Sequence, residues 1–200
     1  MQIKRYKIGF IDNNNYLLWD ESTNQAALID ATSNEQKIVD DVKKLGLTLR
    51  YIILTHGHFD HTTGTKFYQK AFPDAQLVAC KKEAKLLYDR DLSKGPGGIV
   101  ADISVADGDE LLLGDLSLKF IWTPGHTSGG MCILCEKVLF SGDTLLQCSV
   151  GRTDFPTGSM EELVDSIRNK LFVLPDDTRV LPGHNEETTI GFEKRYNPFV

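Results

Sequence analysis

The sequence predicts one α/β domain, and two observations support that prediction. Apolar runs with the length of β-strands recur in both halves of the chain, and helical stretches lie between them. The chain has 200 residues, of which 41% are hydrophobic and 25% are charged, as is typical of a globular domain with a sizeable core. Because no repeat, low-complexity tract or linker-like change of composition interrupts the chain, we expect residues 1–200 to form a single domain.

The N-terminal part is expected to be strand-rich. Apolar runs at residues 4–11 and 16–19 flank a polar segment at 12–15, which predicts a β-hairpin with its turn at that segment. Residues 26–29 form a third apolar run.

A helix is predicted next. Ser33 and Gln36 have the spacing of a capping box, and Gly46 provides a stop signal. Between these signals one apolar stripe comprises Ile38, Val42 and Leu45. The apolar run that follows, at residues 51–54, predicts a buried strand.

The middle of the chain is expected to be less regular. Residues 63–71 and 82–88 look helical, and residues 76–79 predict a strand between them. Residues 91–107 contain a glycine-rich stretch at 95–98 and are predicted to be irregular. This segment is either a mobile flap over a site or a plain surface connection, and the sequence does not separate the two.

Strands dominate again after this segment. Alternation of apolar and polar residues predicts a strand at 116–122, and short apolar runs predict further strands at 131–134, 138–140 and 179–181. A second clear helix begins at Ser159, which Glu162 completes as a capping box. Its buried face is expected to consist of Leu163, Ile167 and Leu171.

The cysteines are expected to be free thiols. Cys132 and Cys135 have the C-x-x-C spacing, but they fall in a predicted strand, where residues three apart point to opposite faces. We therefore predict buried thiols here and no metal-binding or redox pair.

The charge of the chain disfavours two classes of partner. Its net charge of −6 argues against broad electrostatic attraction to nucleic acid or to anionic membranes. Near the start, basic residues are not followed by an apolar stretch of signal-peptide length, and no segment reaches transmembrane length. We expect a cytoplasmic protein that acts on a small molecule.

A histidine-rich stretch follows the predicted strand at 51–54. It places four potential metal ligands within six residues, namely His56, His58, Asp60 and His61. A strand that ends in a loop can aim several side chains at one point. Imidazole and carboxylate groups together suit zinc, and also iron or manganese.

Three more residues of ligand type follow predicted strands in the same way. His126 and His184 each come after an apolar run and a Pro-Gly turn, and Asp143 comes after an apolar run and a Ser-Gly turn. Glycine lets the backbone bend sharply and approach a site closely. Since the loops that leave an α/β sheet at one edge gather there, we expect these residues to complete one metal site.

This ligand pattern resembles the metallo-β-lactamase superfamily over essentially the whole chain. The resemblance implies an αββα sandwich with a two-metal site at one edge. One metal would be bound by His56, His58 and His126, and the other by Asp60, His61 and His184. Asp143 would bridge both metals.

Several branches of the superfamily differ from this sequence. One β-lactamase branch places a cysteine at the second metal, and the flavodiiron branch has a glutamate where His58 stands. The nucleases carry a large inserted domain, for which the spacings His126–Asp143 and Asp143–His184 leave no room. What remains resembles a compact bacterial branch of glyoxalase II, on the motifs at residues 123–129, 141–145, 151–155 and 182–199.

That branch implies a thioesterase acting on S-acylglutathione-type thioesters. A hydroxide shared by two divalent metals, zinc being the expected metal, would attack the thioester carbonyl, and Asp60 would orient it. Arg152 is our candidate for contact with a substrate carboxylate; the alternative is a buried pair with an acid such as Asp154 that holds the loop. True glyoxalase II enzymes continue into a helical region that holds glutathione, whereas this sequence ends at Val200.

Other functions remain open. Mononuclear iron glutathione persulfide dioxygenases also resemble this chain, notably at residues 151–155, and would use His56, His126 and Asp143 as iron ligands. A lactonase is a further hydrolytic option on the same site. A metal-binding protein without turnover is the alternative from another class, and the complete ligand set argues against it.

Overall fold

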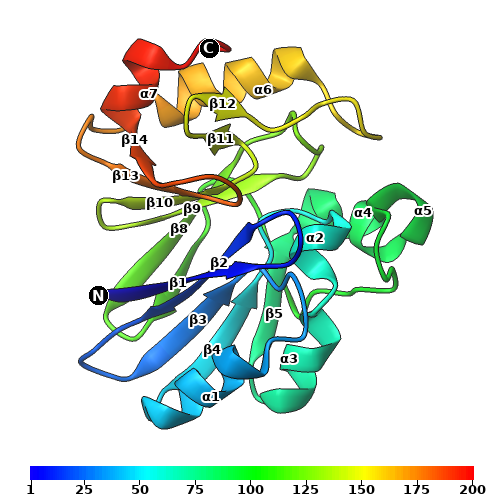
Figure 1. Ribbon diagram of the computed structural model, residues 1–200, viewed down its shortest axis with the longest axis vertical. Coiled ribbons are helices and arrows are strands. Elements are labelled where there is room, and N and C mark those ends of the chain that lie inside the picture. The colour runs from blue at the N-terminus through cyan, green and yellow to red at the C-terminus, as the bar shows by residue number, and fades with distance from the viewer.

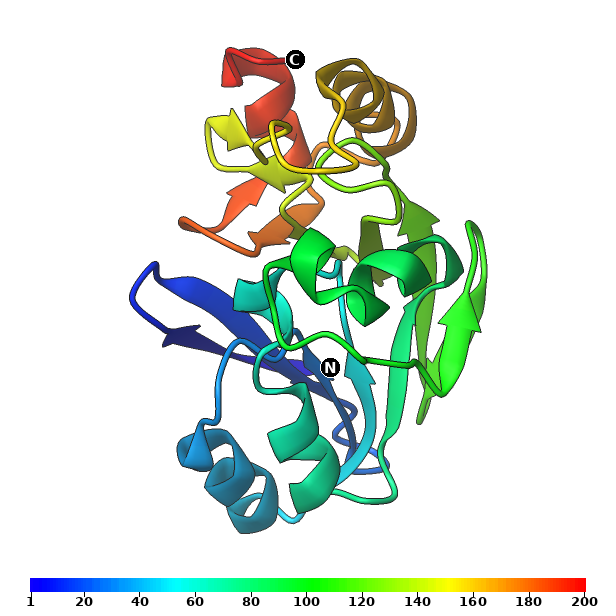
Figure 2. The ribbon, with the colours of Figure 1, turned by 90° about the vertical axis from the view of Figure 1, so that its right-hand side faces the viewer.

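Two six-stranded β-sheets lie face to face, and helices cover their outer faces (Figures 1 and 2). The computed structural model describes all 200 residues. The architecture is the expected αββα sandwich, and it forms a single domain of the α/β class. None of its helices has the length and apolar character needed to cross a membrane.

The first sheet is built by the N-terminal half of the chain. Its strands, in spatial order, are β1 (Gln2–Ile8), β2 (Asn13–Trp19), β3 (Gln25–Ile29), β4 (Thr48–Ile53), β5 (Gln76–Cys80) and β6 (Ile103–Val105). The first three strands pair antiparallel, and the remaining pairs are parallel. Parallel neighbours need crossover connections, and the helices between β3 and β6 supply them.

The second sheet is built by the C-terminal half. Its strands, in spatial order, are β14 (Thr188–Thr189), β13 (Arg179–Pro182), β10 (Val138–Gly142), β9 (Met131–Cys135), β8 (Leu116–Trp122) and β7 (Glu110–Leu113). Only β10 and β13 pair in parallel. A separate two-stranded ribbon, β11 (Leu145–Leu146) and β12 (Ser149–Val150), follows β10.

The helices fall into three groups (Figure 1). The first sheet is covered by α1 (Gln36–Lys44) and α3 (Thr65–Ala71). The second sheet is covered by α6 (Met160–Ser166), its π-helical continuation η2 (Ile167–Leu171) and α7 (Ile190–Tyr196). The boundary between the two halves carries α2 (Phe59–Thr62), the 3-10 turn η1 (Lys81–Glu83), α4 (Ala84–Tyr88) and α5 (Arg90–Ser93).

Hydrophobic side chains fill three layers. The layer between the sheets contains large buried aromatic residues such as Tyr16, Phe120 and Phe140. Two outer layers lie under the helices, and there the predicted helix faces are largely confirmed. Buried positions include Ile38 and Val42 on α1 and the three apolar residues predicted after Ser159, Leu163, Ile167 and Leu171. The prediction fails at Leu45, which lies just after the end of α1 and is exposed.

The predicted N-terminal turn was placed wrongly. The hairpin turns at residues 9–12, and β2 begins at Asn13. Three asparagines, Asn13, Asn14 and Asn15, are buried within this strand. Their amides find partners inside the protein: Asn14 donates to the carbonyl of Pro182, and Asn15 donates to the hydroxyl of Thr32. Polar residues that read as a turn in the sequence are therefore interior hydrogen-bonding groups.

Two further local predictions need correction. No capping box forms at α1, because Ser33 lies outside the helix and its hydroxyl donates to the carboxylate of Glu35. The segment at residues 91–107 is more regular than predicted, since it contains most of α5 and the edge strand β6. At the second helix, the Ser159 hydroxyl accepts from the Glu162 amide as predicted.

The cysteines are free, as predicted. Cys132 and Cys135 are buried on opposite faces of β9, so that Cys132 lies under α6 and Cys135 lies between the sheets. Because side chains alternate between the two faces of a strand, residues three positions apart lie on opposite faces, and the two thiols do not meet.

Candidate metal centre

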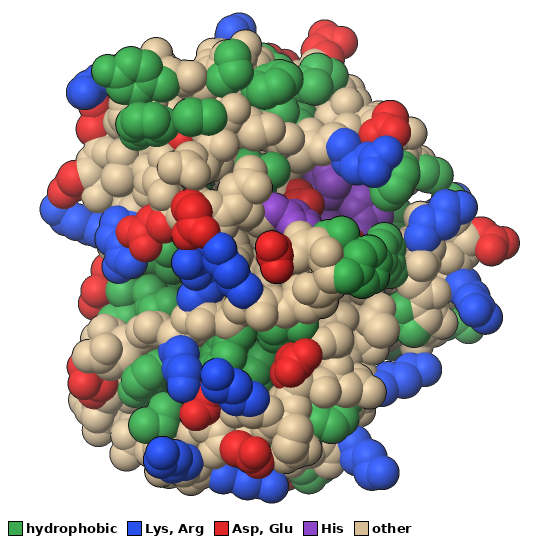
Figure 3. All heavy atoms as spheres, viewed as in Figure 1, with side chains coloured by type: hydrophobic (Ala, Val, Ile, Leu, Met, Phe, Trp, Pro, Cys, Tyr) green, Lys and Arg blue, Asp and Glu red, His purple; other side chains and the backbone are tan.

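Seven side chains of ligand type meet in a hollow at the boundary of the two sheets. They reach it from four strand ends: the loop and helix after β4 carry His56, His58, Asp60 and His61, and the turns after β8, β10 and β13 carry His126, Asp143 and His184. Figure 3 shows the histidine side chains gathered in this hollow. The structure therefore brings together all seven residues singled out from the sequence.

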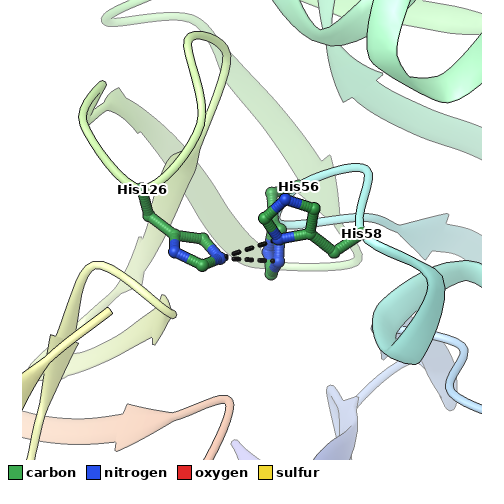
Figure 4. A group of neighbouring side chains, drawn as sticks. All are labelled: His56, His58 and His126. Carbon is green, nitrogen blue, oxygen red and sulfur yellow. Dashed lines mark hydrogen bonds between the residues drawn. The ribbon is translucent and has the colours of Figure 1, made fainter. Parts of the chain in front are cut away.

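The first group consists of three histidines whose rings point toward one another (Figure 4). Nε2 of His126 lies 2.9 Å from Nδ1 of His58 and 3.2 Å from Nε2 of His56. All three residues are buried.

The second group consists of Asp60, His61 and His184. An oxygen of Asp60 lies 3.3 Å from Nε2 of His184 and 3.6 Å from Nε2 of His61. Asp143 lies between the two groups. Its carboxylate is 3.5 Å from Nε2 of His61, 3.5 Å from Nε2 of His184 and 3.7 Å from Nε2 of His126.

The side chains present fit divalent metal ions. Within each group the potential ligand atoms all lie within 4.8 Å of one another. In the three-histidine group, ring nitrogens face ring nitrogens, and a neutral imidazole has only one N–H to offer. Oδ1 of Asp143 is buried without a hydrogen-bond partner. A bound cation would accept the lone pairs of these ring nitrogens and of this carboxylate oxygen.

The first group favours neutral imidazoles. Burial, together with the neighbouring His126, lowers the pKa of His58 to about 4. Burial and the other histidines also lower the pKa of His56 well below its usual range. Neutral imidazole is the form that binds a metal, so this group needs to release no proton at pH 7.

The second group differs because carboxylates surround it. Burial alone would lower the pKa of His61, but Asp30, Asp143 and Asp60 outweigh it and raise this pKa to about 10. For Asp60, burial is outweighed by His184 and His61, which hold the pKa of the carboxyl below its usual range. In the metal-free protein His61 is therefore protonated at neutral pH and Asp60 is ionised.

Comparison with known proteins agrees with this geometry. The family model described as "Metallo-beta-lactamase superfamily" matches residues 8–184. The chain belongs to the metallo-β-lactamase superfamily. It is 34% identical to the hydroxyacylglutathione hydrolase GloC of Haemophilus influenzae, over all of this chain and 98% of that protein. Its place in the superfamily is consistent with the glyoxalase II-like branch and with a metal-dependent hydrolase.

Solved structures of the superfamily superpose closely on this one. The BLEG-1 B3 metallo-β-lactamase aligns with a TM-score of 0.92 and 33% identity, over 99% of both chains. ETHE1 from Myxococcus xanthus aligns with a TM-score of 0.87 and 34% identity, over 99% of this chain and 84% of that one. These relatives have different names within one superfamily, so similarity alone does not identify the reaction of this protein.

In this superfamily member, four of the five histidines are oriented through Nδ1. His126 donates from Nδ1 to the carbonyl of Arg152 at 2.6 Å, and His184 donates to the carbonyl of Ile11 at 3.3 Å. For His61 the acceptor is Asp30, and for His56 the neighbour is the hydroxyl of Thr55. Each of these bonds leaves Nε2 facing the centre, as is common for metal-binding histidines.

Glu83 was not identified from the sequence. Its buried carboxylate accepts a hydrogen bond from the amide of Gly57 at 2.8 Å, between His56 and His58. Its other oxygen lies against Gly129, in the loop that carries His126, where an added Cβ would come within 2.4 Å of it. Burial raises the pKa of Glu83. One carboxyl group thus lies between the two loops of the three-histidine group, hydrogen-bonded to the first loop and packed against the second.

Gly183, in the last Pro-Gly-His turn, passes very close to the centre. A Cβ at this position would lie 2.3 Å from Oδ1 of Asp143 and 2.7 Å from the His61 ring. No side chain fits there without moving two candidate ligands. The sequence predicted that glycine lets this turn approach the site closely. The structure shows that a larger residue at Gly183 would collide with Asp143 and His61.

Arg152 lies at the rim of the hollow. Its guanidinium forms two hydrogen bonds of 2.7 Å with Asp154 and stacks 3.9 Å from the Phe155 ring. The pairing with Asp154 considered from the sequence is therefore present, although both side chains are exposed rather than buried.

Two more polar residues near the centre escaped sequence analysis. Asp30 orients His61, and Asn13 donates to Asp60 at 3.0 Å. Asp30 follows an apolar run, as Asp143 does, so the strand-end signal could have found it. Asn13 gave no such signal, because it was read as part of a turn.

Proposed function

We propose that this protein is a metal-dependent thioesterase that hydrolyses S-acylglutathione-type thioesters. The observation that carries the proposal is the convergence of two ligand groups on Asp143 within one hollow. The similarity to the GloC protein of Haemophilus influenzae, which spans both chains, supports a glutathione thioester as the substrate class.

His56, His58 and His126 would hold one divalent ion, Asp60, His61 and His184 would hold a second, and Asp143 would contribute to both sites. Zinc suits these nitrogen and oxygen ligands, and iron or manganese are the alternatives. When bound, such ions lower the pKa of water to about 7 and polarise a carbonyl oxygen.

Asp60 is the residue we assign to orienting the attacking water. Its carboxylate is fixed by Asn13 and His184, and its lowered pKa keeps it ionised at neutral pH. An ionised carboxylate accepts a hydrogen bond from the water and holds its oxygen toward the carbonyl carbon. Addition of that oxygen and cleavage of the C–S bond give a carboxylic acid and a thiol, with no side-chain nucleophile.

Arg152 is the proposed contact for a carboxylate of the substrate. Its exposed guanidinium stacks on the ring of Phe155, and that ring lies 5.4 Å from the ring of His58. To bind a substrate carboxylate bidentately, the guanidinium would exchange Asp154 for the substrate.

The decisive experiment measures hydrolysis of S-lactoylglutathione by purified protein before chelation, after chelation and after zinc is restored. We expect turnover that is lost with the metal and regained with zinc. Asp143→Ala should lose both turnover and bound metal, whereas the exposed Asp74→Ala should keep both. Unchanged activity and metal content in Asp143→Ala would refute the assignment.

A mononuclear iron glutathione persulfide dioxygenase is the second candidate. The observation that favours it is that its three expected ligands, His56, His126 and Asp143, also meet, with His126 Nε2 being 3.2 Å from His56 and 3.7 Å from Asp143. Iron content and oxygen uptake with glutathione persulfide test this candidate. A chromogenic β-lactam belongs in the same assay, because the chain is similar to BLEG-1.

A further inference from the structure

A pocket of about 230 Å³ adjoins the candidate metal centre. It lies between the tip of the β1–β2 hairpin and helix α2, which are neighbours in both ribbon views (Figures 1 and 2). Asn13 and Asp60 line this pocket and also belong to the centre. A group attached to a carbonyl at the centre can therefore extend into it.

Three apolar side chains line the wall and are wholly or partly exposed to solvent. Phe10 at the hairpin tip is 89% exposed, Ile11 is 42% exposed, and Phe59 on α2 is half-buried. Figure 3 shows hydrophobic side chains directly beside the histidines. Covering such surface with an apolar group is favourable because it removes the surface from water.

Most polar side chains of the wall already form hydrogen bonds within the protein. The Thr32 hydroxyl accepts from Asn15, Ser33 donates to Glu35, and Thr63 donates to the carbonyl of Phe59. No lysine or arginine lines the pocket, and its only charged group is the carboxylate of Asp60. A glutathionyl group carries carboxylates, which this wall would repel.

The hairpin tip is also tied to the centre. The carbonyl of Ile11 accepts a hydrogen bond from His184 Nδ1 at 3.3 Å. The apolar residues of the tip are thus held beside a candidate ligand of the second metal.

We propose that this pocket binds the acyl chain of the thioester, and that the protein favours apolar acyl groups over short hydroxyacyl groups. This inference rests on the proposed thioesterase function. At about 30 Å³ for each water-sized group, the pocket has room for about seven such groups. Medium-length or aromatic acyl chains fit that volume.

The first test compares kcat/KM for S-acetyl-, S-butanoyl-, S-hexanoyl- and S-octanoylglutathione. Each added methylene should raise kcat/KM roughly fourfold until the pocket is full. Phe10→Ala should flatten this dependence on chain length, and Phe199→Ala, which removes another exposed phenylalanine, should not. The same slope in Phe10→Ala and in the unmodified protein would overturn the proposal.

A binding measurement separates this proposal from the proposed reaction. Calorimetric titration of the zinc-loaded protein with acetate, butanoate and hexanoate should show affinity rising with chain length, and Phe10→Ala should reduce that rise. Chain-length-dependent binding without thioester turnover would support the pocket and remove the thioesterase. Turnover without any dependence on chain length would support the thioesterase and remove the pocket's role.

Discussion

The buried carboxylate of Asp30 accepts a hydrogen bond from Nδ1 of His61 at 2.7 Å. The same oxygen accepts from the hydroxyl of Thr55 at 2.9 Å, and that hydroxyl lies 3.1 Å from Nδ1 of His56. Asp30 is therefore connected to one candidate ligand in each metal group. Its backbone has a φ of +62°, a conformation that costs energy for a residue with a Cβ and is found at functional sites.

Replacing Asp30 with asparagine should weaken metal binding. The amide keeps the shape of the side chain but removes the charge that orients His61, and such changes commonly reduce metal affinity about 10- to 100-fold. Zinc content after dialysis against a competing chelator measures the effect. Asp74→Asn, on an exposed residue, is the control, and equal zinc content in both variants would contradict the role of Asp30.

The stability of the metal-free protein should fall as the pH rises above neutrality. Carboxylates that outweigh burial raise the pKa of His61 from 6.5 to about 10. The folded state thus binds the proton more tightly than the unfolded state. This contribution is complete below pH 6.5 and disappears as the pH rises through about 10.

Urea unfolding in the presence of a chelator at pH 6.5 and at pH 10 checks this prediction. We expect the charged His61–Asp30 bond to contribute about 2 kcal/mol at the lower pH. Asp30→Asn should lose less stability than the unmodified protein over the same interval. Parallel losses in both proteins would show that other groups cause the pH dependence.

Local signals explain why the sequence could indicate which residues of ligand type lie together. His126, Asp143 and His184 each follow an apolar run and a short turn, and the other four lie just after β4, so their positions near strand ends can be read from neighbouring residues. Asp30 and Glu83 depend instead on distant contacts. Asp30 contacts His61, and Glu83 contacts Gly57, through pairs that are 31 and 26 positions apart in the chain. Such contacts exist only after the chain has folded.

The error at the hairpin has a related cause. Asparagine is common in turns, and a run of three beside an aspartate predicts one. In the folded protein Asn13 and Asn14 instead satisfy groups around the centre, such as the Asp60 carboxylate and the Pro182 carbonyl. The presence of a strand at residues 16–19 was predictable, but its exact start depended on these long-range partners.

Glu83→Ala should loosen the three-histidine group. It leaves the buried amide of Gly57 without its acceptor, which costs about 1 to 3 kcal/mol of stability. Glu83→Gln should restore most of that stability, because the loop requires an acceptor oxygen and burial already disfavours the charged form of Glu83. Urea unfolding and zinc content of both variants measure the difference. Equal losses in the two variants would contradict this account.

Gly183→Ala should eliminate metal loading. The added methyl group would lie 2.3 Å from Oδ1 of Asp143 and 2.7 Å from the His61 ring, so both candidate ligands must move. Gly108→Ala is the matched control. Gly108 has a φ of +83° and open space where a Cβ would lie, so alanine there strains the backbone without a steric clash. That strain costs about 1 kcal/mol of stability.

Zinc stoichiometry after chelation and reloading, measured beside the unfolding midpoint, separates the two glycine variants. Gly183→Ala should lose zinc out of proportion to any loss of stability, because its clash is with the ligands themselves. Gly108→Ala should lose stability and keep its zinc. Full zinc loading in Gly183→Ala would mean that the turn can retreat without disturbing Asp143 and His61, and that its close approach does not shape the centre.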